Sequence, residues 1–139
     1  MRQKMISNEI IILRDTFRRL LRRKANTNLT KLIEKTHPAD MALLFRFFSE
    51  IEQNELFTIM RPGEHTGEFL GELDELIIKR LIENETPQHV ADLIEFTSSN
   101  DQASILSVIE EEASQAILDL LKSEEQEEVE EIMGYPEDS

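Results

Sequence analysis

Apolar residues recur along most of this chain at intervals of three and four positions, with short polar breaks between the runs. Ile10, Leu13, Phe17, Leu20 and Leu21, for example, all fall on one face of a helix. Glycine and proline together number only 8, and runs of β-branched residues are short. The pattern therefore predicts an all-α chain of about ten short helices and no strand.

Polar residues that suit helix starts and ends stand between the apolar runs. Ser49 with Glu52 and Ser123 with Gln126 have the spacing of a capping box, in which each residue bonds the backbone of the other. The segment 26–28, Asn-Thr-Asn, is expected to end the first helix. These signals divide the chain into helices of roughly ten residues.

Proline and glycine mark further boundaries. His37-Pro38 and Thr86-Pro87 each predict a helix start with proline in the first turn. Arg61-Pro62-Gly63 predicts a turn, followed by helices over 64–72 and 73–84. Gly134 suits a left-handed C-cap after the last helix.

Residues 38–60 are echoed at residues 87–109, an offset of 49 without a gap. Six identities carry the match: Pro38, Ala42, Leu44, Phe47, Ser49 and Gln53 return as Pro87, Ala91, Leu93, Phe96, Ser98 and Gln102. A weaker echo at an offset of 24 leads from Leu93 and Ile94 to Ile117 and Leu118. Repeats of this period predict stacked helix pairs, an α-solenoid, because one pair cannot bury its apolar face alone.

Composition narrows the class of protein. The chain has 139 residues, enough for one domain with its own core, and no cysteine, so that disulfides and thiolate metal sites are excluded. Its longest apolar runs, 10–13 and 41–45, are far too short to span a membrane, and no signal-peptide pattern is present. We expect a soluble piece.

Charge is unevenly distributed. Residues 1–36 hold 10 Lys or Arg and 3 Asp or Glu, whereas residues 37–139 hold 5 basic and 26 acidic residues. An acidic body of this kind repels phosphate backbones, which argues against nucleic-acid binding, and attracts divalent cations or basic partners. The alternative is an acidic surface that only keeps the domain in solution.

The basic N-terminal segment carries an arginine stripe, Arg14, Arg18 and Arg22. Three interpretations are open: contact with anionic lipid or a membrane-facing domain, non-specific RNA binding, or packing against an acidic face of the same body or of a dimer mate. We favour the last, and predict these arginines to be partner contacts.

The sequence contains no recognisable catalytic motif. It contains no Ser-His-Asp order, no glycine-rich phosphate loop and no HExxH, and its three histidines lack the paired spacing of a zinc site. The acidic run 124–131 has the spacing of a solvated helix face. We expect no enzyme.

The motif His37-Pro38-Ala39-Asp40, the repeat and the closing Tyr135-Pro136-Glu137-Asp138-Ser139 together resemble the cytosolic N domain of the MgtE family of magnesium transporters. The resemblance covers residues 29–134 as the N domain and 135–139 as the start of a linker to a pair of CBS domains. Residues 1–28 form a basic helix and turn outside it.

The resemblance implies a right-handed superhelical domain on the cytoplasmic side of the cell membrane, in a homodimer whose CBS domains follow in the same polypeptide. It implies that Mg²⁺ holds the N and CBS domains together and the pore shut. Two Mg²⁺ ligands of the family fall by motif on Glu68 and Asp92, and Gln88 stands where the family has a third acid.

Two rival interpretations remain. The helical-repeat architecture also resembles domains of the flagellar motor switch protein FliG, so the chain could be a protein–protein adaptor. It could also regulate a CBS protein that never enters a membrane.

Overall fold

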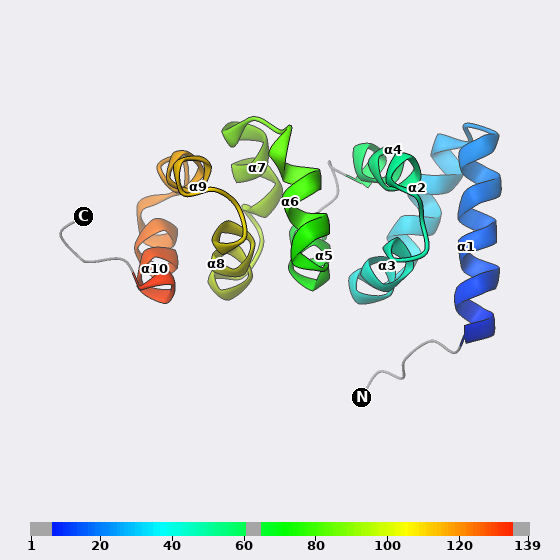
Figure 1. The fold of residues 1–139 in the computed structure, drawn as a ribbon, viewed down its shortest axis with the longest axis horizontal. Helices are drawn as coiled ribbons and strands as arrows, with labels where there is room; N and C mark the ends of the chain where they lie inside the picture. The colour runs from blue at the N-terminus through cyan, green and yellow to red at the C-terminus, as the bar shows by residue number, and fades with distance from the viewer. Residues whose placement is uncertain (1–6, 61–64, 135–139) are drawn as a thin grey trace. The chain divides into compact units, whose positions relative to one another are not determined.

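The computed structural model describes residues 7–60 and 65–134, and these ranges contain ten helices and no strand. Figure 1 shows the helices in chain order. They are α1 (Ser7–Arg22), α2 (Asn26–Lys35), α3 (Pro38–Phe45), α4 (Glu50–Met60), α5 (Thr66–Glu72), α6 (Glu75–Glu83), α7 (Pro87–Ile94), α8 (Ser99–Ser107), α9 (Glu111–Leu118) and α10 (Ser123–Met133). The all-α prediction is confirmed. The predicted turn 61–63 and closing motif 135–139 lie outside the described ranges.

The helices form two compact units, residues 1–61 and residues 62–139. In the first unit α1 packs on α2 and α4, and α2 packs on α4. Phe17 of α1 is fully buried, and its ring meets that of Phe48 edge-on with centroids 6.1 Å apart. Phe45 of α3 meets the same Phe48 ring at 6.1 Å. Burying these rings anchors the basic first helix to the unit.

The second unit is a stack of helix pairs. Helix α5 packs on α7 and α8, α7 packs on α9, and α8 packs on α9 and α10. The core of the stack contains Phe69, Leu70, Ile94, Ile105, Leu106, Ile117, Leu118 and Val129, each at most 2% exposed. The predicted stacking is thus present within this unit, while the right-handed superhelix remains a prediction.

The 49-residue repeat corresponds to equivalent helix pairs, α3–α4 and α7–α8. The side-chain amide of Gln53 donates to the carbonyl oxygen of Phe45 at 2.6 Å, and that of Gln102 donates to the carbonyl of Ile94 at 2.7 Å. Both glutamines are buried. Each bond gives the buried glutamine amide an acceptor at the end of the pair's first helix, where the same carbonyl also accepts from the backbone N–H three residues on.

Besides the start of α3 at His37-Pro38, three further predicted helix boundaries are confirmed. Ser49 and Glu52 bond reciprocally, with Ser49 N donating to Glu52 Oε1 at 2.9 Å and Glu52 N donating to Ser49 Oγ at 3.2 Å. The hydroxyl of Thr86 accepts from His89 N ahead of Pro87. Gly134 ends α10 with φ of 80°, in the left-handed region. Local sequence chemistry determined all three.

Two predicted boundaries are wrong. Segment 26–28 does not end the first helix but opens α2. The break falls two residues earlier, where Lys24 adopts φ of 54°, Lys24 N donates to Leu21 O and Ala25 N donates to Leu20 O. These two bonds form a Schellman motif, in which the position that glycine usually occupies is held by a lysine.

The second error concerns Ser123 and Gln126. The N-cap of α10 is Lys122, which has no side-chain capping bond, and Ser123 is already helical. An N-cap side chain needs extended backbone to reach the helix amides, and Ser123 lacks it. Gln126 instead donates to Glu130 Oε1 at 3.0 Å.

Candidate functional site

Glu68 lies in the first turn of α5, on the side that faces solvent. Its neighbours Thr66, Gly67, Phe69 and Leu70 are buried, so the helix period directs the Glu68 carboxylate outward. The side chain is 49% exposed, and its Oε2 lies 3.6 Å from Nδ1 of His65. An exposed carboxylate near a helix start is accessible to a cation.

Asp92 lies in α7 in a similar setting. Val90, Ala91, Leu93 and Ile94 around it are buried, and Asp92 is the exposed residue between them. Helix α5 packs against α7, so Glu68 and Asp92 stand on adjacent helices of one unit. Both predicted ligands are thus surface carboxylates on neighbouring elements.

Gln88 stands one turn before Asp92 and contacts it directly. The Nε2 of Gln88 donates to Asp92 Oδ1 at 2.9 Å. A glutamate at this position would offer a second carboxylate, whereas glutamine offers Asp92 a neutral donor. A cation that approaches this oxygen of Asp92 must displace the amide or share it.

Among the described residues no three His, Asp or Glu side chains gather closely enough to hold a metal ion by themselves. His37 Nδ1 accepts from Ala39 N at 3.1 Å, as a helix cap, and His89 Nδ1 lies 3.4 Å from Glu85 Oε2. With the contact between His65 and Glu68, all three histidines have local partners near helix starts. Within the described ranges, no helix is long and apolar enough to cross a membrane.

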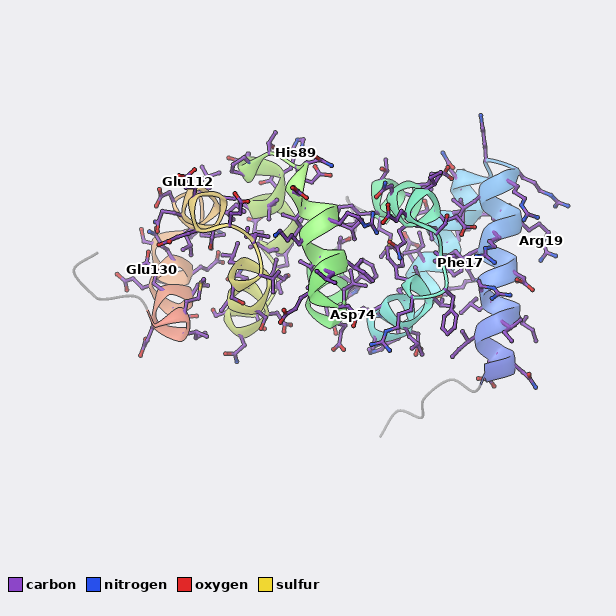
Figure 2. The ribbon with its side chains drawn as sticks, viewed as in Figure 1. Phe17, Arg19, Asp74, His89, Glu112 and Glu130 are labelled. Atoms are coloured by element: carbon purple, nitrogen blue, oxygen red, sulfur yellow. The ribbon has the colours of Figure 1, made fainter. Side chains whose placement is uncertain are left out.

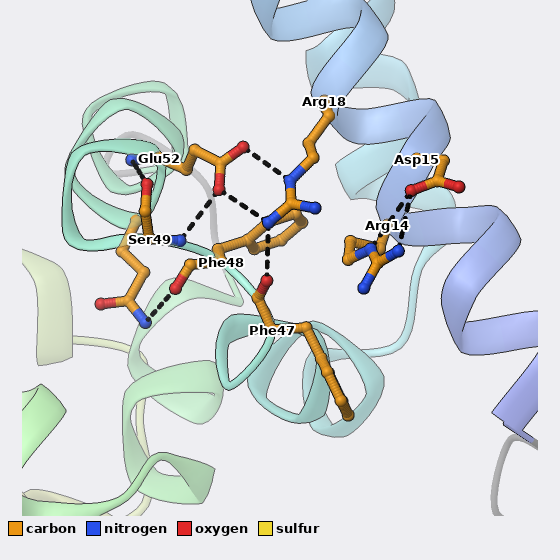
Figure 3. A network of polar contacts seen from close by, with 8 residues as sticks. Arg14, Asp15, Arg18, Phe47, Phe48, Ser49 and Glu52 are labelled. Atoms are coloured by element: carbon orange, nitrogen blue, oxygen red, sulfur yellow. Dashed lines mark hydrogen bonds and ion pairs between the residues drawn. The ribbon is translucent and has the colours of Figure 1, made fainter.

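Arg18 makes the most extensive polar contacts of the basic stripe (Figure 3). Its Nε donates to Glu52 Oε2 at 2.8 Å, and its NH2 group donates to Glu52 Oε1 at 3.1 Å and to the carbonyl oxygen of Phe47 at 2.9 Å. The guanidinium also lies 6.0 Å from the centroid of the Phe48 ring. Arg18 therefore holds α1 against the start of α4.

The pair changes the acidity of both partners. The hydrogen bond to Glu52 raises the pKa of Arg18 above its ordinary value. Burial tends to raise the pKa of Glu52, but the bonds from Arg18 and Ser49 outweigh burial and lower it overall. Both shifts favour the charged pair.

The other two arginines of the stripe, Arg14 and Arg22, have different surroundings from Arg18. Arg14 binds the adjacent Asp15, with its NH2 group 3.1 Å from Asp15 Oδ1. Arg22 is exposed and lines a groove together with Lys24, Glu52 and Glu55. The favoured interpretation, packing against an acidic face of the same body or of a dimer mate, is met within the same body by Arg18, which bonds Glu52 directly. Contact of the stripe with another molecule remains a prediction.

Sequence reasoning recognised Glu52 as a cap but missed it as the partner of Arg18, because the two residues lie 34 positions apart. It also missed the role of the buried glutamines. A signal existed for them: Gln53 and Gln102 are polar identities within an otherwise apolar repeat, which indicates a buried hydrogen bond.

Comparison with known proteins gives one family and one fold. The model of the MgtE intracellular N domain matches residues 36–138. The chain is similar to a crystal structure of the soluble part of a magnesium transporter, with a TM-score of 0.76 and 16% identity, over 92% of this chain and 50% of that one. It thus spans half the length of that solved chain. No curated protein matches.

Proposed function

Because its residues 36–138 make the chain a member of the MgtE intracellular N domain family, we propose that it senses Mg²⁺ on the cytoplasmic side of the membrane and helps to gate a magnesium transporter. The observation that carries the proposal is the pair of outward-facing carboxylates, Glu68 and Asp92, on packed helices of one unit. Mg²⁺ takes oxygen ligands in octahedral geometry and keeps several waters, so one or two carboxylates from each of two surfaces suffice to bridge them.

The proposed partner surface is a pair of CBS domains of the same polypeptide, in a homodimer. Residues 62–139 hold 3 Lys or Arg and 22 Asp or Glu, a net charge of −19. A facing acidic surface would be repelled by this unit without a cation and held by it with one. Mg²⁺ thereby acts as a switch between two arrangements of domains, as ion-gated elements do elsewhere. The role is regulatory and involves no catalysis.

The test is calorimetric titration with Mg²⁺ of the chain joined to its CBS pair. We expect Glu68→Ala and Asp92→Ala each to weaken binding about tenfold, the loss of about 1.4 kcal/mol of binding free energy. Gln88→Glu should tighten binding, because it replaces the amide donor beside Asp92 with a further carboxylate.

The matched control is Glu112→Ala. Glu112 is an exposed glutamate of α9 in the same unit, and its substitution removes the same charge (Figure 2). If Glu112→Ala weakens Mg²⁺ binding as much as Glu68→Ala and Asp92→Ala do, the effect is only net charge and the assigned ligands are wrong.

A second candidate function is that of a protein–protein adaptor. Two large apolar side chains of the second unit are largely exposed, Leu76 at 82% and Phe96 at 77%, and apolar side chains form the centre of protein–protein interfaces. An adaptor would bind its partner equally in Mg²⁺ and in EDTA, whereas a sensor would not.

A further inference from the structure

One side of α1 is exposed, and its edge at Arg22 borders a groove that Glu52 and Glu55 of α4 also line. At 100° per residue, Ile11, Ile12, Arg19, Arg22 and Arg23 fall within about a third of the helix circumference, and all five are exposed. Ile12 is 66% exposed and Ile11 is 44% exposed. We call these five residues the outer face of α1. Figure 2 shows Arg19 on the side of α1 opposite to the buried Phe17.

The arginines of the outer face are not those that hold α1 in place. Arg18 is engaged by Glu52 and by the carbonyl of Phe47, and Arg14 is engaged by Asp15. The outer face thus combines two isoleucines in its first half with three arginines in its second half. This combination suits an apolar site with an acidic border.

The second unit contains such a site between α6, α7 and α9. It is a half-open hollow of about 130 Å³. The buried side chains of Ile82, Val90 and Ile117 line it, and Glu83, Glu85 and Glu110 stand around them together with Lys79. We call it the acidic hollow. Apolar cavities of roughly 150 Å³ accept a benzene-sized group, so the hollow is suited to one aliphatic side chain.

We propose that the outer face of α1 in one copy of this chain docks on the acidic hollow of a second copy. Residues 1–61 hold 12 basic and 7 acidic residues, a net charge of +5, against −19 for residues 62–139. The two units of different copies therefore attract each other. Ile12 enters the hollow, and Arg19 and Arg22 meet its glutamates.

Each copy carries both surfaces, so the contact either closes into a reciprocal pair or continues from copy to copy. The contact needs no Mg²⁺, and in this respect it goes beyond the proposed sensing function. The experiment is run in EDTA, so that failure of the Mg²⁺ proposal leaves its result unaffected.

The experiment is sedimentation equilibrium of the full chain at low salt and at about 0.5 M salt, where charge interactions are screened within a few ångströms. We expect association at low salt and at least tenfold weaker association at high salt. Arg19→Glu/Arg22→Glu should be monomeric. Lys31→Glu/Lys35→Glu is the matched control, since it makes the same change of charge on exposed residues of α2 in the same unit, and it should still associate.

A charge swap makes the test specific. Glu83→Lys/Glu110→Lys, which reverses two charges beside the hollow, should be monomeric alone. Mixing it with Arg19→Glu/Arg22→Glu should restore association between the two variants. A monomeric wild type at low salt, equal losses in the α1 and α2 variants, or an unrestored mixture would each overturn the proposal. So would a monomer whose outer face binds anionic vesicles instead.

Discussion

At the residue scale, the Glu52 side chain both caps α4 and forms an ion pair with Arg18 of α1. Glu52 closes the capping box of α4 through Ser49 and receives two bonds from Arg18 of α1. Both side chains are less than a third exposed, so solvent screens the pair less than it screens a typical surface ion pair. The capping geometry fixes the carboxylate where α1 must pack.

A double-mutant cycle with Arg18→Met and Glu52→Gln, read by urea unfolding at pH 7, should give a coupling free energy of about 1 kcal/mol. The pKa of Glu52 is lowered from 4.5, so this contribution is complete above that value and is lost as pH falls through the folded-state pKa. The cycle repeated at a pH where Glu52 is protonated should show little coupling. An unchanged coupling there would mean that packing, not charge, joins the pair.

The six repeat identities separate into those that packing explains and one that it does not. Ala and Leu are buried, Ser caps the second helix, Gln bonds the first, and Pro opens the pair. The phenylalanine is different, because Phe47 is 44% exposed and Phe96 is 77% exposed. Nothing in the described ranges explains its recurrence.

At the scale of elements, α5 approaches its neighbours closely because it carries glycine. A Cβ placed on Gly67 would lie 1.7 Å from Thr97 Oγ1 and 3.0 Å from the carbonyl oxygen of Leu93. A Cβ on Gly71 would meet Asp101 at 3.2 Å. Gly67 is therefore required by the contact, while Gly71 is nearly replaceable.

Gly67→Ala should destabilise the chain by roughly 1–3 kcal/mol, the usual effect of overpacking. Gly71→Ala, in the same helix, should be near neutral, since the gain in helix propensity of about 1 kcal/mol offsets a small shift of Asp101. Thermal unfolding of both variants measures the difference. Adding Thr97→Ala should recover part of the loss in Gly67→Ala, and full loss despite that change would exclude the Thr97 clash as the cause.

Helix boundaries show what sequence can predict and why it fails elsewhere. Thr86-Pro87, Ser49 with Glu52, and Gly134 were predictable because each acts on a backbone within a few residues. The end of α1 was not predictable, because the left-handed residue there is Lys24 and not the glycine that usually marks such a position. The close approach of Gly67 to Thr97 was not predictable either, because the two residues lie 30 positions apart and meet only through helix packing.

At the scale of the whole chain, charge is divided between the units, with +5 in residues 1–61 and −19 in residues 62–139. This asymmetry is read directly from the sequence, whose motifs also predict Glu68 and Asp92 as ligands, and that assignment stays a prediction. The sequence predicted that the arginine stripe packs against an acidic face, but it could not identify the partners of Arg14 and Arg18 or the arginines that remain on the outer face of α1, because both depend on how the helices pack.

Self-repulsion within the acidic unit predicts a dependence on ionic strength. The melting temperature should rise as NaCl is added from low to physiological concentration, because added ions screen like charges. Mg²⁺ compared at equal ionic strength should raise it further only through bound ions. Differential scanning calorimetry measures both, and a melting temperature that falls with NaCl would show that attractive pairs outweigh the repulsion.

The buried glutamine bonds have a consequence for how such a chain can change length. Each bond joins two helices of one pair, from Gln53 to Phe45 and from Gln102 to Ile94. Neither bond involves a residue of a neighbouring helix pair. A helix pair can therefore be duplicated or deleted as a cassette, provided that the cut keeps glutamine and carbonyl eight residues apart. A cut that falls inside the pair would leave the buried glutamine amide without its carbonyl partner.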